Sequence, residues 1–120
     1  MGTISSYRDL LVWQQAVDLT VAVYTISKTW PKEELYGLTS QARRSATSAA
    51  ANIAEGYGRE NKGSYVQFLR IAQGSLKELE THLIVAERVK IASADSASEL
   101  LRQCESVGKL LRALIRKLQS

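Results

Sequence analysis

Residues 38–58 read LTSQARRSATSAAANIAEGYG, a helical stretch built almost without large side chains. Its inward side is predicted from residues at helical spacing, which are Ala42, Ala46, Ala49, Ala50 and Ile53. A helix whose inward side is mostly alanine cannot fill space with its own bulk. Neighbouring backbones can come close to it, and those neighbours must supply the large residues. The stretch therefore predicts a tightly packed helical bundle.

The alanine-rich helix is predicted to cover about residues 39–55, because Gly56 and Gly58 are typical of a helix end. The longest helix follows it, over about residues 63–90, and has the most regular apolar row. That row alternates by four and three residues and consists of Tyr65, Leu69, Ala72, Leu76, Leu79, Leu83 and Ala86. Such a heptad row packs at the shallow crossing angle of helical bundles. Gly74 inside this helix costs about 1 kcal/mol relative to alanine, and we expect a close approach to the alanine-rich helix to compensate.

The helix that precedes the alanine-rich stretch is predicted over about residues 7–28. It carries two adjacent apolar rows, one with Trp13, Val17, Thr20 and Tyr24, the other with Ala16, Leu19, Val23 and Ile26. Together they make an apolar face wider than one partner helix needs. The helix ends at Thr29–Pro31, because proline disfavours helix in the residue before it.

The last helix is predicted over about residues 96–119, after a polar loop at Ala92–Ala97. Ser96 and Glu99 match the S-x-x-E capping box. Four antiparallel helices joined by short loops form an up-down-up-down bundle. The predicted fold class is all-α, with one four-helix-bundle domain over residues 1–120.

Composition bounds the class of protein. The chain has 120 residues, 45% of them hydrophobic, and a net charge of +4, a mild basic bias that is compatible with a polyanionic partner. No run of about 18 apolar residues is present to span a membrane, and the segment MGTISSYRDL lacks the apolar core of a signal peptide. The single cysteine, Cys104, rules out an internal disulfide. These features predict a cytoplasmic protein without a membrane partner.

Three segments carry a family resemblance: LLVWQQAVDL at 10–19, WPKEELYGLTSQARRSATSAAANIAEGYGR at 30–59 and FLRIAQGSLKELETHL at 68–83. They resemble the bacterial four-helix-bundle proteins encoded in intervening sequences of large-subunit ribosomal RNA genes. The resemblance extends from about Tyr7 to Leu118. It implies a homopentamer arranged as a ring or barrel. A more distant similarity is to the accessory protein of diversity-generating retroelements, a pentamer that works with a reverse transcriptase and nucleic acid. No established biochemical activity comes with the family.

Catalytic chemistry has little support in the sequence. His82 is the only histidine and Cys104 the only thiol, so neither can complete a zinc site with a second residue of its kind. Cys104 falls on the apolar side of the last helix and is interpreted as a core thiol. His82 is interpreted as a surface or interface residue. We predict no enzyme activity, no metal, no cofactor and no small-molecule substrate.

Five polar residues around the alanine-rich helix form a candidate network: Gln41, Arg43, Arg44, Asn52 and Glu55. Hydrogen bonds among such side chains would fix the helix register or a subunit contact, and we favour that structural interpretation. A ligand or nucleic-acid site is the alternative.

A basic stripe on the last helix is the clearest functional signal. Its members, Arg102, Lys109, Arg112 and Arg116, fall within about 80° of one another at 100° per residue. Arg59 and Lys62 add charge between the second and third helices. A solvated face that keeps the protein soluble explains the stripe equally well. Aromatic residues do not interleave with these charges, so nucleic-acid binding here would be directed to the phosphate backbone and tolerant of sequence.

The apolar surface exceeds what one bundle can cover. The doubled face of the first helix is joined by Ile71, Val85 and Val89, which lie off the heptad row of the third. We therefore predict a homo-oligomer, and the number five comes from the resemblance. RNA is the predicted partner of that assembly. The alternative is a scaffold that recruits another protein through residues 56–63 and 92–97.

Overall fold

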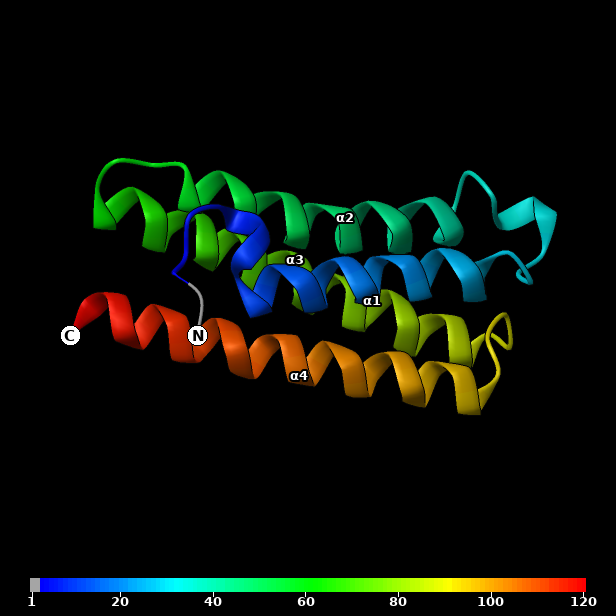
Figure 1. Ribbon diagram of the computed structural model, residues 1–120. Helices are drawn as coiled ribbons and strands as arrows, with labels where there is room; N and C mark the ends of the chain where they lie inside the picture. Colours follow the sequence, from blue (N-terminus) through cyan, green and yellow to red (C-terminus); the bar gives the residue numbers. More distant parts are fainter. Residues whose placement is uncertain (1–2) are drawn as a thin grey trace.

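The computed structural model, which describes residues 3–120, has four long helices arranged as an antiparallel bundle (Figure 1). The elements in chain order are η1 (Tyr7–Asp9), α1 (Leu11–Ser27), η2 (Lys32–Glu34), α2 (Leu38–Tyr57), α3 (Lys62–Arg88) and α4 (Ala94–Gln119). Each long helix packs on the next in the sequence, and α4 also packs on α1. α1 and α3 therefore occupy opposite corners, as do α2 and α4. The predicted up-down-up-down topology is confirmed.

The predicted start of the first helix at Tyr7 is wrong. A separate 3-10 turn comes first, in which Ser6 Oγ accepts a hydrogen bond from Arg8 N at 3.2 Å and the Asp9 carboxylate accepts from Ser6 N at 3.1 Å. Leu10 is extended, with φ −75° and ψ 123°, so α1 begins only at Leu11. The capped turn satisfies backbone donors that a longer helix would have used.

The core consists of the rows that the sequence predicts on α2 and α3. Ala42, Ala46 and Ile53 of α2 are buried, and every member of the α3 row is buried except Tyr65, which is half-buried. On α1 the buried row is Ala16, Leu19 and Val23, while the neighbouring row lies at the margin. Leucines from three helices thus fill the space that the alanines leave.

The backbone of α2 lies close to α3 at Gly56. A Cβ atom there would lie 3.0 Å from Phe68 Cβ and 3.1 Å from Tyr65 Cδ1. The expectation that Gly74 makes this approach is wrong, because a Cβ at Gly74 would meet no atom within 4 Å. The sequence predicts Gly56 only as a helix terminator, yet α2 continues through it to Tyr57.

The start of α4 also differs from the prediction. Ser93 is the N-cap, and its hydroxyl oxygen accepts a hydrogen bond from Ser96 N at 3.1 Å. The predicted loop at Ala92–Ala97 is therefore helical from Ala94 onward, and Ser96 lies inside the helix. The S-x-x-E capping box is wrong because Ser93 offers the same hydroxyl one turn earlier.

Large apolar side chains remain exposed along α1 and α3 and in the turn before α2. They are Leu11, Val21 and Tyr24 on α1, Leu35 and Tyr36 in the turn, and Ile71, Ile84, Val85 on α3 with Val89 just after it. The predicted exposure of Ile71, Val85 and Val89 is confirmed. No helix within residues 3–120 is long and apolar enough to cross a bilayer.

Candidate nucleic-acid interface

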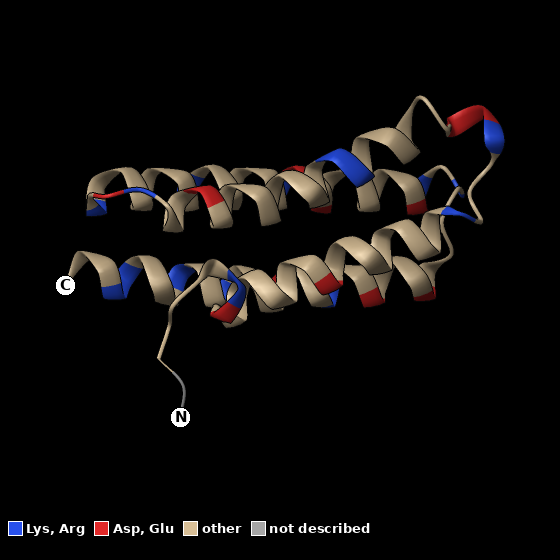
Figure 2. Ribbon diagram, turned by 45° about the horizontal axis from the view of Figure 1, so that its top comes forward, with Lys and Arg blue, Asp and Glu red and all other residues tan. Residues whose placement is uncertain are grey.

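The basic stripe lies on the outward side of α4. Lys109, Arg112 and Arg116 are exposed in the second half of the helix, and no carboxylate in the described chain pairs with them. Figure 2 shows the blue Lys and Arg segments toward the C-terminal end of α4. Cations in the last turns of a helix also complement its dipole.

Arg102 is separate from this group. Its guanidinium donates to both oxygens of the Glu99 carboxylate, at 3.1 and 2.6 Å. Hydrogen bonds from Arg102 and then Gln103 lower the pKa of Glu99 to about 2. Arg102 is therefore neutralised locally, about two helical turns before Lys109. In the sequence, this ion pair is indicated by the acid Glu99 three residues before the base Arg102 on a helix.

Arg59 and Lys62 lie at the connection between α2 and α3. Arg59 stacks over the ring of Phe68, 4.4 Å from its centroid, and lies 3.6 Å from the Glu55 carboxylate. Lys62 is exposed at the first position of α3, directly after the capping residue Asn61. Of the two, Lys62 keeps an uncompensated charge.

The structure brings these residues to one end of the bundle. The α2–α3 connection and the C-terminus of α4 lie at the same end in Figure 1, and η1 lies further in, within the same half of the bundle. We define the basic end as residues 3–17, 48–75 and 107–120, cut near the level at which Ser48 meets Ser75 and Gln15 meets Ser106. It contains eight Lys and Arg against three Asp and Glu, a side-chain charge of +5, so the rest of the chain carries −1 of the total of +4.

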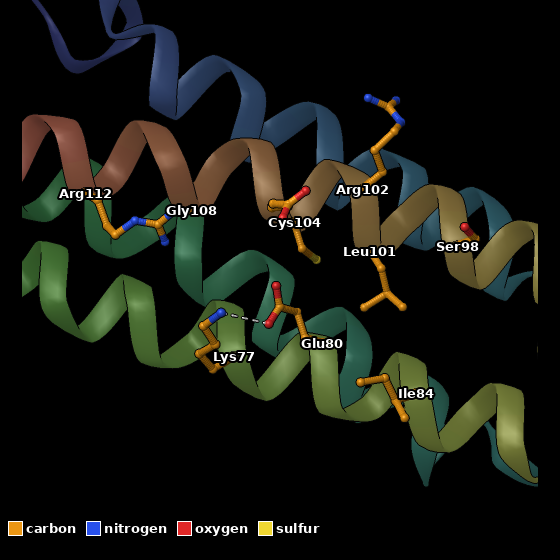
Figure 3. Close-up of a pocket in the computed structure, with 10 residues that line it drawn as sticks. Lys77, Glu80, Ile84, Ser98, Leu101, Arg102, Cys104, Gly108 and Arg112 are labelled. Atoms are coloured by element: carbon orange, nitrogen blue, oxygen red, sulfur yellow. Dashed lines mark hydrogen bonds and ion pairs between the residues drawn. The ribbon is translucent and has the colours of Figure 1, made fainter.

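A cleft of about 460 Å³ opens between α3 and α4 (Figure 3). Its walls carry both signs of charge, since Lys77 pairs with Glu80 at 3.1 Å while Arg112 and Glu105 extend from α4. Cys104 also lines the cleft, but burial, with a smaller contribution from Glu80, raises the pKa of its thiol to about 12. The thiol is therefore protonated at neutral pH and is a poor nucleophile. No three His, Cys, Asp or Glu side chains of residues 3–120 gather into a metal-binding group.

The five polar residues of the candidate network lie in separate places. Arg43 Nε donates to Ser27 Oγ at 2.8 Å and its guanidinium stacks on Tyr24, which fastens α2 to the end of α1. Asn52 donates to the backbone oxygen of Ser48 at 2.8 Å. Gln41, Arg44 and Glu55 are exposed, and Glu55 pairs with Arg59 rather than with a member of the network.

The hydrogen bond between α2 and α3 comes instead from two serines. Ser48 Oγ and Ser75 Oγ lie 2.8 Å apart, and Asn52 also donates to Ser48 Oγ at 3.1 Å. Neither serine is singled out by the sequence. Ser48 lies one helical turn after Arg44 on α2, and Ser75 lies directly before the buried Leu76 on α3. The only sequence feature that indicates the hydrogen bond is a small polar residue next to a buried apolar row.

His82 is half-buried on α3. Its Nε2 lies 3.5 Å from the Glu78 carboxylate and has no hydrogen-bond partner within residues 3–120. The ring lines a shallow groove with Val85, Gly37 and Glu34. This placement agrees with the predicted surface or interface histidine.

Comparison with known proteins shows the family. The model of one family, described as the 23S rRNA-intervening sequence protein, matches residues 8–113. The chain belongs to this family. The match to the 23S rRNA-intervening sequence protein family thus covers residues of all four helices and most of the basic end. No curated protein matches the chain.

A solved structure has the same fold as this member of the 23S rRNA-intervening sequence protein family. It is a protein of unknown function from the S23 ribosomal protein family of Bacteroides thetaiotaomicron. The TM-score is 0.82 at 22% sequence identity, and the alignment covers 88% of this chain and 98% of the other. At that identity the likeness supports the fold and does not transfer a function.

Proposed function

We propose that this protein is a cytoplasmic, non-enzymatic homo-oligomer, a pentamer as the family resemblance implies, that binds RNA through its basic end. The observation that carries the proposal is the separation of charge along the bundle, +5 in one half against −1 in the other. The family name refers to an intervening sequence of 23S rRNA, which makes a structured RNA the first polyanion to test.

The chemistry of the basic end favours phosphate contacts. Lys62, Lys109, Arg112 and Arg116 are exposed cations that can approach a nucleic-acid backbone without breaking an ion pair. The aromatic rings at this end are already engaged, because Tyr57 packs edge-on against Tyr65 and Arg59 covers Phe68. Base stacking therefore has no free platform among these rings, and binding should tolerate changes of sequence.

Self-association would strengthen this binding. Each copy contributes only a few cations, but an RNA that spans several copies binds the second and later ones at a high effective concentration. The apolar side chains exposed on α1 and α3 supply the driving force for bringing copies together.

Replacing Lys109, Arg112 and Arg116 by Ala should weaken RNA binding similarly for all sequences. Loss of three phosphate contacts should make the slope of log K against log salt shallower by about 2 to 3. The measurement is a titration of labelled structured RNA by fluorescence anisotropy at several salt concentrations. The matched control replaces Lys28, Lys32 and Arg102 by Ala. These residues lie outside the basic end, and their replacement removes the same amount of positive charge.

The control variant should bind nearly as the parent protein does. Equal weakening by both triple variants would show that only net charge matters, which contradicts a local interface. Phosphate contacts are stronger at low salt, so the absence of RNA binding even at about 50 mM salt would overturn the proposal. A stoichiometric protein partner retained after nuclease treatment would favour the scaffold alternative instead.

A further inference from the structure

The outward side of α3 carries a second heptad row that no helix of this chain covers. Its members are Ile71, Gly74, Glu78, Thr81, Val85 and Arg88, spaced three, four, three, four and three residues apart. All are exposed, Ile71 at 46% and Val85 at 42%. The same spacing on the inward side of α3 packs against the bundle, so this row has the geometry of a helix-packing seam.

Gly74 gives this row a feature that the single chain does not explain. Glycine inside a helix is unfavourable, and the two buried helical glycines, Gly56 and Gly108, each compensate by contact with a neighbouring helix, where an added Cβ would lie 3.5 Å or less from the nearest atom. At Gly74 that space is open, with nothing within 4 Å. A missing side chain within an exposed row permits close approach of a helix from another molecule.

A matching row lies on the opposite corner of the bundle. It runs along the outward side of α1 and consists of Leu11, Gln14, Asp18, Val21 and Thr25, again alternating by three and four. Leu11 is 55% exposed and Val21 is 59% exposed. Because α1 and α3 run in the same direction on opposite corners, the two rows point away from each other and cannot meet within one chain (Figure 1).

The α3 row itself carries one acid and one base, Glu78 and Arg88, whose charges offset each other. Opposite charges that are unpaired within the described residues lie on the α1 row and beside the α3 row. Asp18 is the only charged residue of the α1 row, and it has no ion pair within residues 3–120. Arg70, one turn before Gly74 and beside Ile71, is exposed and likewise has no ion pair in that range. Placing Asp18 opposite Arg70 would favour contact between the unlike surfaces over contact between two α1 surfaces, which would bring two Asp18 carboxylates together.

We propose that the α1 row of one copy docks on the α3 row of a second copy, with Asp18 facing Arg70 of its neighbour and Gly74 at the closest approach. The inference rests on the self-association in the proposed function and specifies its surfaces. Contact between two different surfaces is heterologous; it forms a ring, of an odd or even number of copies, where the rotation between copies closes, and an open filament where it does not. Face-to-face pairing of identical surfaces gives only twofold dimers.

Charge reversal tests this contact by sedimentation equilibrium. Asp18→Arg and Arg70→Asp should each lower the mass toward the 13.3 kDa of a single chain, at a concentration where the parent protein is assembled. The double variant should regain the parent mass, because the charges are again opposite. Glu105→Arg, a reversal at an exposed site of α4, is the control and should keep the parent mass. Circular dichroism confirms that each variant is folded.

Gly74→Leu provides a second test of the docking surfaces that does not depend on charge. It should also lower the mass while leaving the single chain folded, since the position is open within the chain. An assembled parent protein whose mass is unchanged by these variants overturns the docking surfaces and leaves self-association standing. A double variant that stays dissociated while folded overturns the Asp18–Arg70 contact. A parent protein of 13.3 kDa overturns self-association itself.

Discussion

Leu79→Ala is expected to lower the free energy of unfolding by about 2–5 kcal/mol. Leu79 is 0% exposed at the centre of the inward row of α3. Its neighbour α2 contributes alanines to the core, and alanine cannot extend into the space that the lost leucine leaves. The cavity should therefore persist, which places the loss toward the upper part of that range.

The measurement is urea unfolding followed by circular dichroism at one fixed protein concentration, because self-association would shift the midpoint. Ile84→Ala is the control, since Ile84 is on the same helix but 41% exposed. It should cost clearly less. Equal losses for the two variants would contradict the assignment of Leu79 to a core that α2 cannot refill.

Gly56→Ala is expected to destabilise the bundle by about 1–3 kcal/mol, the usual cost of overpacking. The new methyl group would lie 3.0 Å from Phe68 Cβ and 3.2 Å from the backbone oxygen of Tyr65. Neither is the free end of a flexible side chain, so α2 and α3 must move apart. The gain in helix propensity, about 1 kcal/mol at most, offsets only part of that cost.

Gly108→Ala is the matched control, because Gly108 is also buried inside a helix. Its Cβ would lie 3.5 Å from Leu76 Cδ2, an ordinary contact, so the substitution should be neutral or stabilising. Thermal unfolding of both variants distinguishes the two sites. A Gly56→Ala variant as stable as the parent protein would show that the α2–α3 contact can relax.

The helices and their inward rows could be predicted from the sequence, because both follow from periodicity. The α3 row from Leu69 to Ala86 is buried as predicted, and α2 is the small-residue helix of the core. Helix ends were less predictable. Ser93 and Ser96 both have a capping hydroxyl, and only the chain path decides that Ser93 serves as the cap. Leu10 likewise fits a helical pattern until the capped turn before it is known.

The glycines show a second limit. Gly56 and Gly74 are both helical, and the spacing of residues does not reveal which one faces a neighbouring backbone. The sequence favours the interior glycine for the close contact, whereas the contact falls on Gly56, near the helix end. The distinction depends on the rotation and crossing of two helices, which is a tertiary property.

The candidate interface was predictable in part. The spacing of Lys109, Arg112 and Arg116 places them on one side of α4, and the structure agrees. Arg102 shares that spacing but is bound to Glu99. A count of cations by spacing alone ignores acids three residues away and therefore overestimates the free positive charge of the stripe. The grouping with Lys62 at one end required the topology, because Lys62 lies on a different helix from the other three.

The proposed self-association would cover the exposed apolar rows and would allow a weak basic end to hold a long polyanion, so the other proposals depend on it. Sedimentation equilibrium of the unmodified protein at micromolar concentration tests it most directly. We expect a particle several times heavier than the 13.3 kDa chain, and five times that mass for the pentamer. A single species of 13.3 kDa, unchanged as the protein concentration is raised, would contradict it.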